Sequence, residues 1–318
     1  KFGISLNNTM LVRGGAMVNI YTDGTIHLNH GGTEMGQGLF TKIAQICGDA
    51  FGVPIDKVAI TPTHTGKVPN SSATAASSGT DLNGMATAAA AETLKARMAT
   101  YLAAQYQADV ARVRFADEKV YVGDEVISFA KAAMMCWQGR ISLSATGFYA
   151  TPHIHWDPDK AKGAPFYYFA YGAAVTEVAV DRLTGENRLL RVDILHDVGR
   201  SINPALDRGQ IEGGFIQGAG WLTTEELVYG KDGRLQTHAP ATYKIPACSD
   251  RPAILNIDLF ESGGNPAHTI HKSKAVGEPP FMLAASVHSA LRHAIEGLAE
   301  VRMPNLDAPA TAKHRLMT

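Results

Sequence analysis

The sequence contains little cysteine and little net charge. Among its 318 residues are only three cysteines, Cys47, Cys136 and Cys248, and 30 acidic side chains stand against 29 basic ones. Because the cysteines are odd in number and far apart, they argue against a disulfide framework and favour a reducing, cytoplasmic compartment. A net charge of −1 without long runs of one sign argues against a nucleic-acid surface. We therefore expect a small-molecule partner.

Long apolar runs and common nucleotide-binding motifs are also missing. No apolar run reaches the roughly 18 residues that span a bilayer, so we expect a soluble chain without a membrane partner. The glycine-rich segments lack both the dinucleotide spacing and the P-loop lysine, which disfavours NAD and ATP. Of twelve histidines, only His153 and His155 form a close pair, and no acid lies at a useful offset, so we expect no metal bound directly through side chains. The chain begins at Lys1 rather than at methionine, and we expect it to be a piece of a longer protein.

The pattern of apolar residues predicts a mixed architecture. Two strands within 15–28 flank the turn at Asp23-Gly24, and further strands are expected at 57–61, within 113–127 and at 166–181, 188–197, 226–229 and 254–260. Helices are expected at 39–51, 81–105 and 129–139, at 203–224 and after Glu278, whereas 145–165 reads as irregular. Strands and helices are mixed with hairpins, so the fold class is α+β, in two halves of similar style at 1–150 and 151–318.

Two loops rich in small residues each precede a predicted helix. Residues 31–38 hold four glycines, which let backbone amides approach a ligand at a helix start, and the Gln37 amide can pair with a heterocycle edge. A plain tight turn is the alternative. Residues 70–79 offer hydroxyls and amides before a helix with an expected cap at Asp81, which suits a phosphate or a flat cofactor. A flexible linker is the alternative there.

The predicted helix at 203–224 is unusually rich in glycine. Gly213, Gly214, Gly218 and Gly220 lie within it, although glycine costs close to 1 kcal/mol per helix position relative to alanine. Close packing against a backbone or a ligand would compensate for that cost. Gln217 lies two turns from Gln210 on the same predicted face.

Glu278 lies between Gly277 and Pro279. Because a residue before proline is pushed away from helical backbone, we expect Glu278 to be extended and held stiffly at the start of the last helix. A carboxylate positioned in this way suits a general base. The alternative is an acid that only stabilises the positive end of the helix dipole.

Taken together, these segments resemble the molybdenum hydroxylase family, and within it the xanthine dehydrogenases. The matches follow the family's order over nearly the whole chain, and several are long enough to be specific. They are Gly31-Gly32-Thr33-Glu34-Met35-Gly36-Gln37-Gly38, Val68-Pro69-Asn70 with Thr74-Ala75-Ala76-Ser77, Gln210-Ile211-Glu212-Gly213 with Gln217-Gly218, Thr242-Tyr243-Lys244-Ile245-Pro246, and residues 273–280.

The resemblance implies the C-terminal, molybdopterin-binding region of the large subunit, with Glu278 as general base. The implied reaction is the oxidative hydroxylation of a purine, xanthine or hypoxanthine, with water as the oxygen source. Another N-heterocycle or an aldehyde is the alternative substrate, and a non-catalytic cofactor-holding module is the alternative function. The molybdenum would be held by the sulfurs of the pterin. The residues implied to contact the cofactor are Met35, Gly36, Gln37, Ala76, Ser77, Gly79, Gln217 and Gly277, and those implied to meet the substrate are Leu6, Asn7 and Ala75.

The same resemblance implies that the chain is inactive alone. An upstream half of the molybdenum domain would complete the pocket, and 2Fe-2S and FAD groups on other domains or subunits would carry electrons away from an oligomeric enzyme. Near the start of this region animal xanthine dehydrogenases have a phenylalanine and a threonine, whereas this chain reads Ser5-Leu6-Asn7-Asn8. If Leu6 occupies the position of the ring that meets the substrate, an aromatic contact is lost and the prediction of a purine is weaker, but xanthine or hypoxanthine remains the expected substrate.

Overall fold

The chain forms two compact units in the computed structural model, which describes residues 12–67, 71–261, 263–299 and 304–317. The first, called the N-unit below, comprises Phe2–Tyr168 and Asn265–Ala275, and the second, the C-unit, comprises Phe169–Gly264 and Val276–Thr318. The sequence predicted a division after residue 150, whereas the units part after Tyr168 and the N-unit takes back a later segment. In the described part of the chain, no helix is long and apolar enough to cross a membrane.

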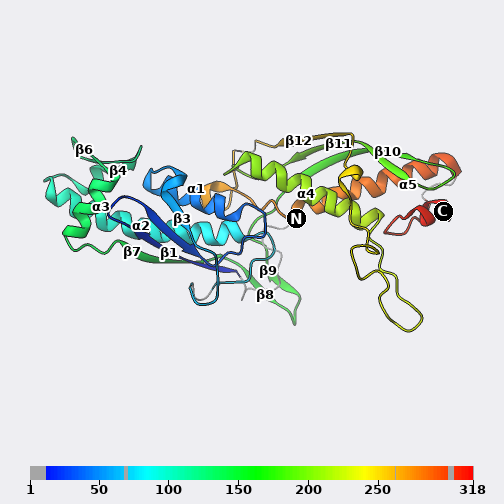
Figure 1. The fold of residues 1–318 in the computed structure, drawn as a ribbon, viewed down its shortest axis with the longest axis horizontal. Helices are drawn as coiled ribbons and strands as arrows, with labels where there is room; N and C mark the ends of the chain where they lie inside the picture. Colours follow the sequence, from blue (N-terminus) through cyan, green and yellow to red (C-terminus); the bar gives the residue numbers. More distant parts are fainter. Residues whose placement is uncertain (1–11, 68–70, 262, 300–303, 318) are drawn as a thin grey trace. The chain divides into compact units, whose positions relative to one another are not determined.

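The N-unit is built on a four-stranded sheet with the strand order β3-β2-β1-β7 (Figure 1). The hairpin predicted around Asp23-Gly24 is confirmed as antiparallel β1 and β2, and β3 adds to β2 in parallel. The two helices predicted after the loops are confirmed as well, and they pack against each other. The bounds are β1 Arg13–Ile20, β2 Ile26–His30, α1 Leu39–Phe51, β3 Val58–Ile60, α2 Gly79–Gln105 and β7 Ser144–Ala150.

Helix α2 lies unusually close to strands β1 and β7, which explains both its alanine content and a wrong prediction. A Cβ atom at Gly147 would overlap the carbonyl oxygen of Ala86, so only glycine allows this approach. The sequence predicted irregular structure from residue 145, yet β7 pairs with β1 along its whole length. The small residues that this close contact requires hide the alternation typical of a strand.

A smaller sheet and a short hairpin complete the N-unit. The strands predicted within 113–127 form the antiparallel order β4-β5-β6, and the helix predicted at 129–139 follows them, capped by the Ser128 hydroxyl. The bounds are β4 Val113–Ala116, β5 Lys119–Val122, β6 Glu125–Ser128, α3 Phe129–Gln138, β8 His155–Asp157 and β9 Lys162–Ala164.

The C-unit packs two helices on one face of a three-stranded sheet of order β10-β11-β12. Apolar residues from the sheet and from both helices, among them Val192, Ile211, Phe215 and Leu291, form its buried core. Asn203 caps the glycine-rich helix, since its Oδ1 accepts from the Leu206 N–H at 3.1 Å. The bounds are β10 Gly172–Val180, β11 Asn187–His196, α4 Pro204–Thr223, β12 Ile254–Leu259, 3₁₀ helix η6 Pro279–Ala284, α5 Ala285–Ala299 and α6 Ala312–Met317.

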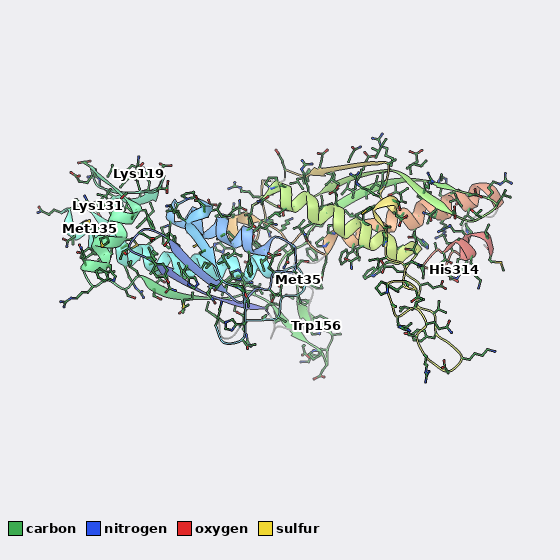
Figure 2. The ribbon with its side chains drawn as sticks, viewed as in Figure 1. Met35, Lys119, Lys131, Met135, Trp156 and His314 are labelled. Carbon is green, nitrogen blue, oxygen red and sulfur yellow. The ribbon has the colours of Figure 1, made fainter. Side chains whose placement is uncertain are left out.

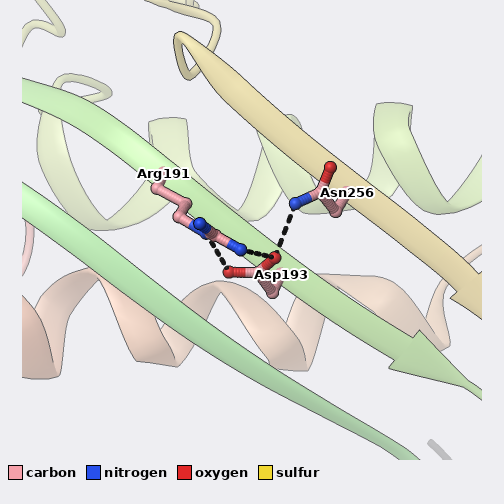
Figure 3. A network of polar contacts seen from close by, with 3 residues as sticks. All are labelled: Arg191, Asp193 and Asn256. Carbon is pink, nitrogen blue, oxygen red and sulfur yellow. Dashed lines mark hydrogen bonds and ion pairs between the residues drawn. The ribbon is translucent and has the colours of Figure 1, made fainter.

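The opposite face of this sheet carries a network of polar contacts. Figure 3 shows Arg191 donating two hydrogen bonds to Asp193, at 2.7 and 3.0 Å, while Asn256 on β12 donates a third at 2.7 Å. These neighbouring strands are parallel, as β2 and β3 are in the N-unit. Each unit therefore begins with an antiparallel pair, a helix, a parallel third strand and another helix, which confirms two halves of similar style within an α+β fold.

Two strand predictions in the C-unit are wrong in extent or existence. The strand expected at 166–181 begins only at Gly172, and the strand expected at 226–229 is reduced to a single bridge between Tyr229 and Leu235. Within 225–253 no longer ladder forms, and large side chains of the expected strand, such as Leu227 and Tyr229, are exposed.

Candidate cofactor site

The glycine loop at 31–38 is closed by one of its own side chains. Glu34 Oε1 accepts from the backbone N–H groups of Gly36 and Gly38 at 2.8 and 3.0 Å, and its Oε2 accepts from Phe40 at 2.9 Å. Burial alone would raise the pKa of Glu34, but these backbone hydrogen bonds outweigh it and lower the pKa. The start of α1 therefore already holds a carboxylate, where the sequence predicted room for an anionic ligand.

Gln37 also turns back onto its own loop. Its Oε1 accepts from the Met35 N–H at 2.5 Å, and its Nε2 donates to the Thr33 carbonyl at 2.8 Å. Met35, labelled in Figure 2, is 69% exposed, and no atom lies within 4 Å of the position a Cβ would take at Gly36. The tip of the loop is therefore open, but Gln37 must exchange its internal partners before it can pair with a ligand.

The second loop, 71–79, lies beside the first and carries backbone strain. The Thr33 N–H donates to Thr74 Oγ1 at 2.8 Å, and the Gly15 N–H donates to Ser71 Oγ at 3.1 Å. Ala76 and Ser77 both adopt left-handed backbone, with φ of 58° and 57°. Such residues cost on the order of 1–3 kcal/mol each and cluster at functional sites. The predicted linker is thus a structured loop tied to its neighbour.

The helix after this loop starts earlier than predicted and is capped differently. Ser78 is the residue before α2, and its side chain makes no capping hydrogen bond within the described part of the chain. Asp81, the expected cap, is instead buried and accepts from the Tyr168 hydroxyl at 2.5 Å. Gly79 begins the helix, and Ala75 is exposed on the loop. The carboxylate in the first turn of α2 is thus bonded to Tyr168, whereas the carboxylate before α1 accepts from backbone N–H groups at the helix start.

Buried polar atoms without partners lie next to the first loop. Burial lowers the pKa of His30 to about 4, against the opposing charge of Glu34, so its ring is neutral near pH 7. His30 Nδ1 accepts from the Gly32 N–H at 3.1 Å, which places the ring hydrogen on Nε2. Nε2 and Asn83 Oδ1 have no partner among the residues that the structure describes. A donor and an acceptor therefore lie unsatisfied near Gly32, which suits a bound water or a polar ligand group.

In the C-unit, the glycines of α4 receive the turn that contains Glu278. A Cβ atom at Gly218 would lie 2.6 Å from the Phe281 carbonyl oxygen, and one at Gly214 would lie 3.1 Å from that of Gly277. Close backbone packing thus explains both glycines, as the sequence predicted. Gln217 is exposed on the same helix and Gln210 is half-buried.

Glu278 departs from its predicted conformation. Its φ of −94° and ψ of −28° place it in the right-handed helical region, not in extended backbone. Its carbonyl accepts from the Phe281 N–H at 2.9 Å. Pro279 and Pro280 occupy the first two positions of η6, where their lack of a backbone N–H leaves no donor unsatisfied. The half-buried Glu278 therefore begins a 3₁₀ turn that leads into α5, and the preference imposed by the following proline is overridden.

The predicted site residues divide between the two units. Met35, Gly36, Gln37, Ala75, Ala76, Ser77 and Gly79 lie on two adjoining loops of the N-unit, whereas Gln217, Gly277 and Glu278 belong to the C-unit. Leu6 and Asn7 lie outside the described residues. No cluster of three or more His, Cys, Asp or Glu able to hold a metal occurs among the residues searched, 12–67, 71–261, 263–299 and 304–317.

Sequence reasoning missed the roles of Glu34 and Tyr168. An acid just before a predicted helix was a usable indication of a cap for Glu34. Nothing local to Tyr168 indicates a bond to a residue 87 positions away.

The two N-unit loops fit a flat, hydrogen-bonding and partly anionic cofactor. Open space at Gly36, the small side chains of Ala76 and Ser77 in strained backbone, and a helix start without a capping side chain are features that such a group requires. The second loop suits an anionic group better than the first, because Glu34 already accepts from backbone N–H groups at the start of α1.

Comparison with known proteins identifies this arrangement. Residues 1–252 match the molybdopterin cofactor-binding domain. The chain is 45% identical to a xanthine dehydrogenase of Oryza sativa over 323 residues and 42% identical to the xanthine dehydrogenase/oxidase of Mus musculus over 318, covering 98% of this chain and 22% of each relative. It thus spans about a fifth of those proteins. The crystal structure of quinoline 2-oxidoreductase from Pseudomonas putida 86 matches with a TM-score of 0.82 and 25% identity, over 95% of this chain and 38% of that one. The family match and these relatives place the chain in the molybdopterin cofactor-binding domain family, within the xanthine dehydrogenase-like molybdenum hydroxylases.

Proposed function

We propose that this chain is the molybdopterin-binding part of an enzyme that hydroxylates a purine, xanthine or hypoxanthine, with water as the oxygen source. The observation that carries the proposal is the identity of 42–45% to xanthine dehydrogenases over 98% of the chain. The left-handed backbone at Ala76 and Ser77 and the close packing of the Glu278 turn on α4 depend on the small and proline residues present, which supports an ordered, working site.

The chain's own residues bind and orient the cofactor in this proposal. When bound, molybdenum–molybdopterin supplies two-electron redox chemistry. Ala76, Ser77 and Gly79 present backbone at the uncapped start of α2, and Met35, Gly36 and Gln37 cover the cofactor from the open tip of the first loop. Gln217 and Gly277 contribute from the C-unit, and Ala75, Leu6 and Asn7 meet the substrate.

Glu278 acts as the general base. Its carboxylate takes a proton from the water that supplies the oxygen, which makes that oxygen a better nucleophile towards an electron-poor ring carbon. The 3₁₀ turn, with buried Pro279 and Pro280, limits the positions the carboxylate can take.

The remainder of the enzyme completes the reaction. We expect an upstream half of the molybdenum domain to close the pocket, and 2Fe-2S and FAD groups on other domains or subunits of an oligomer to remove electrons. The 318-residue chain alone should therefore not sustain turnover, and steady xanthine oxidation by it would contradict this part of the proposal.

The test is Glu278→Gln in the intact protein, with Glu177→Gln on exposed strand β10 as the matched control. Elemental analysis should find molybdenum in both variants, while xanthine turnover should fall by orders of magnitude only in Glu278→Gln. Equal turnover in the two variants would remove Glu278 from the mechanism. Molybdenum without turnover in the unmodified protein would favour a non-catalytic cofactor-holding module.

A second candidate is the hydroxylation of another N-heterocycle. The structural match to quinoline 2-oxidoreductase favours it, as does Leu6 at a position where an aromatic ring is expected. Comparing quinoline with xanthine under the same conditions distinguishes the two substrates by their kcat/KM values.

A further inference from the structure

The Tyr168 side chain links the ends of the two chain segments that form the N-unit. Tyr168 ends the long first segment of that unit, and Ala275 ends the segment that returns to it. The Tyr168 hydroxyl accepts from the Ala275 N–H at 2.8 Å and donates to Asp81 Oδ2 at 2.5 Å. All three residues are at most 6% exposed, so water does not compete for these hydrogen bonds.

Asp81, which accepts the hydrogen bond from Tyr168, lies beside the proposed cofactor site. Asp81 lies in the first turn of α2, directly after the strained loop that contains Ala76 and Ser77. Lys42, buried in the first turn of α1, acts on Asp81 through its charge. The Tyr168 hydroxyl is therefore held by the same helix start that presents backbone to the proposed cofactor.

The donor at the other end leads directly to Glu278. Three residues of chain span at most about 10 Å, so Glu278 is tethered within that distance of the anchored Ala275. On either side of Glu278, the backbone of Gly277 and of Phe281 packs on the glycines of α4. The segment that carries the proposed base is thus held at Ala275 by Tyr168, and next to Glu278 by α4.

We propose that Tyr168, held by Asp81, is a positioning residue that sets the place of Glu278 by fixing the Ala275 backbone. This proposal rests on the proposed role of Glu278 as general base and adds Tyr168 and Asp81 as residues that position it. Tyr168 itself need touch neither cofactor nor substrate, so its loss should reduce the rate of the chemical step more than substrate affinity.

A purely structural role for Tyr168 makes different predictions. It would lower stability and molybdenum content together, and it would leave kcat per bound molybdenum unchanged. A positioning role lowers kcat per molybdenum while KM stays nearly constant, and it loosens residues 265–275 without unfolding the unit.

The experiment compares Tyr168→Phe with Tyr121→Phe in the intact protein. Tyr121 is a matched control, because its hydroxyl also donates to an aspartate, Asp117 at 3.3 Å, but on the surface of the small β4-β5-β6 sheet. In Tyr168→Phe we expect amide hydrogen exchange in the peptide covering 265–275 to rise about 10- to 100-fold, the range expected when a buried N–H loses its partner. We further expect kcat per molybdenum to fall at least tenfold with KM within twofold. Neither quantity should change in Tyr121→Phe.

A second variant keeps the inference testable if Tyr168→Phe does not fold. Asp81→Asn keeps an oxygen acceptor for the Tyr168 hydroxyl and should therefore keep both the exchange protection of 265–275 and kcat near the values of the unmodified protein. Asp81→Ala removes the acceptor and should show the same faster exchange and lower kcat as Tyr168→Phe. Unchanged exchange in Asp81→Ala and Tyr168→Phe, or unchanged kcat despite faster exchange, would overturn the positioning role. Failure of the unmodified, molybdenum-loaded protein to oxidise xanthine would count against the proposed function and not against the anchoring of Ala275 by Tyr168, since exchange is measured independently.

Discussion

The two helices that follow the cofactor loops begin with carboxylates in opposite situations. Glu34, half-buried before α1, accepts three backbone hydrogen bonds and has a lowered pKa. Asp81, fully buried in α2, has a pKa raised to about 7 by desolvation, although Tyr168 and Lys42 partly offset that effect. Glu34 accepts from the N–H groups at the start of α1 as an anion. Asp81 points into the interior and leaves the start of α2 without a side-chain cap.

This difference decides which loop can accept a ligand. A helix start occupied by its own carboxylate repels a second anion, whereas a helix start without a side-chain cap still offers N–H groups and partial positive charge. The strained residues Ala76 and Ser77 occur only at the second loop of the pair. We therefore propose that the start of α2 binds the anionic portion of the cofactor and that the loop before α1 covers it.

Asp81→Asn should give the largest contrast between the two carboxylates. Because the folded protein raises the pKa of Asp81, the stability it contributes is complete below the unfolded pKa near 3.9 and is lost as pH rises through about 7. The slope reaches at most about 1.4 kcal/mol per pH unit. Thermal unfolding of the intact protein between pH 4 and 8 should show this decline, and Asp81→Asn should flatten it. Parallel profiles for the two proteins would show that Asp81 ionises freely.

Ala76→Val tests whether the left-handed backbone of the second loop is needed. A β-branched residue at φ of 58° in a buried position should cost about 2–3 kcal/mol and displace the loop. We expect molybdenum content to fall severalfold. Ala76→Gly is the control, since glycine adopts this backbone without strain and should retain the metal. Equal molybdenum in both variants would separate the loop's conformation from cofactor binding.

Glu34→Gln tests the closed helix start. Loss of the carboxylate should destabilise the N-unit by about 1 kcal/mol at neutral pH. Because the pKa of Glu34 is lowered on folding, its contribution is present above the unfolded pKa and is lost as pH falls through the folded pKa, the opposite direction to Asp81. Denaturant titrations should therefore show a larger difference between the two proteins at pH 7 than at pH 3. Glu92→Gln, which removes an exposed pair with Lys95, is the control and should change little at either pH.

Gln37→Ala should have the smallest effect on stability. The side chain is bonded only within its own loop, so we expect a change within about 0.5 kcal/mol. Cofactor retention should nevertheless weaken if Gln37 turns outward to pair with the pterin. Molybdenum content measured after dialysis gives the answer, and an unchanged value would leave Gln37 as a loop-closing residue only.

Much of the fold follows from local chemistry. The Asp-Gly turn, the cap at Asn203 and the boundaries of α1 could be predicted because each depends on residues adjacent in sequence. The glycines of α4 were recognised as a sign of close packing because their cost to a helix is intrinsic to glycine. Their partners, the backbone atoms of Gly277 and Phe281, could not be read from the helix itself.

The wrong predictions share a physical cause. Strand β7 was missed because contact with α2 demands small residues that do not alternate. Glu278 was predicted to be extended from the local preference before proline, and the prediction is wrong because packing on α4 outweighs that preference. Asp81 was predicted as a cap because its position fits one, yet a tyrosine 87 residues away binds it instead.

The sequence by itself determined the identity of the loops, the turn around Glu278 and the family, since these depend on residue types in a fixed order. Only the tertiary structure decided which helix start remains open and where each carboxylate points. Both outcomes depend on burial and on partners distant in sequence, and the free energy of a buried charge changes sign with the groups that surround it.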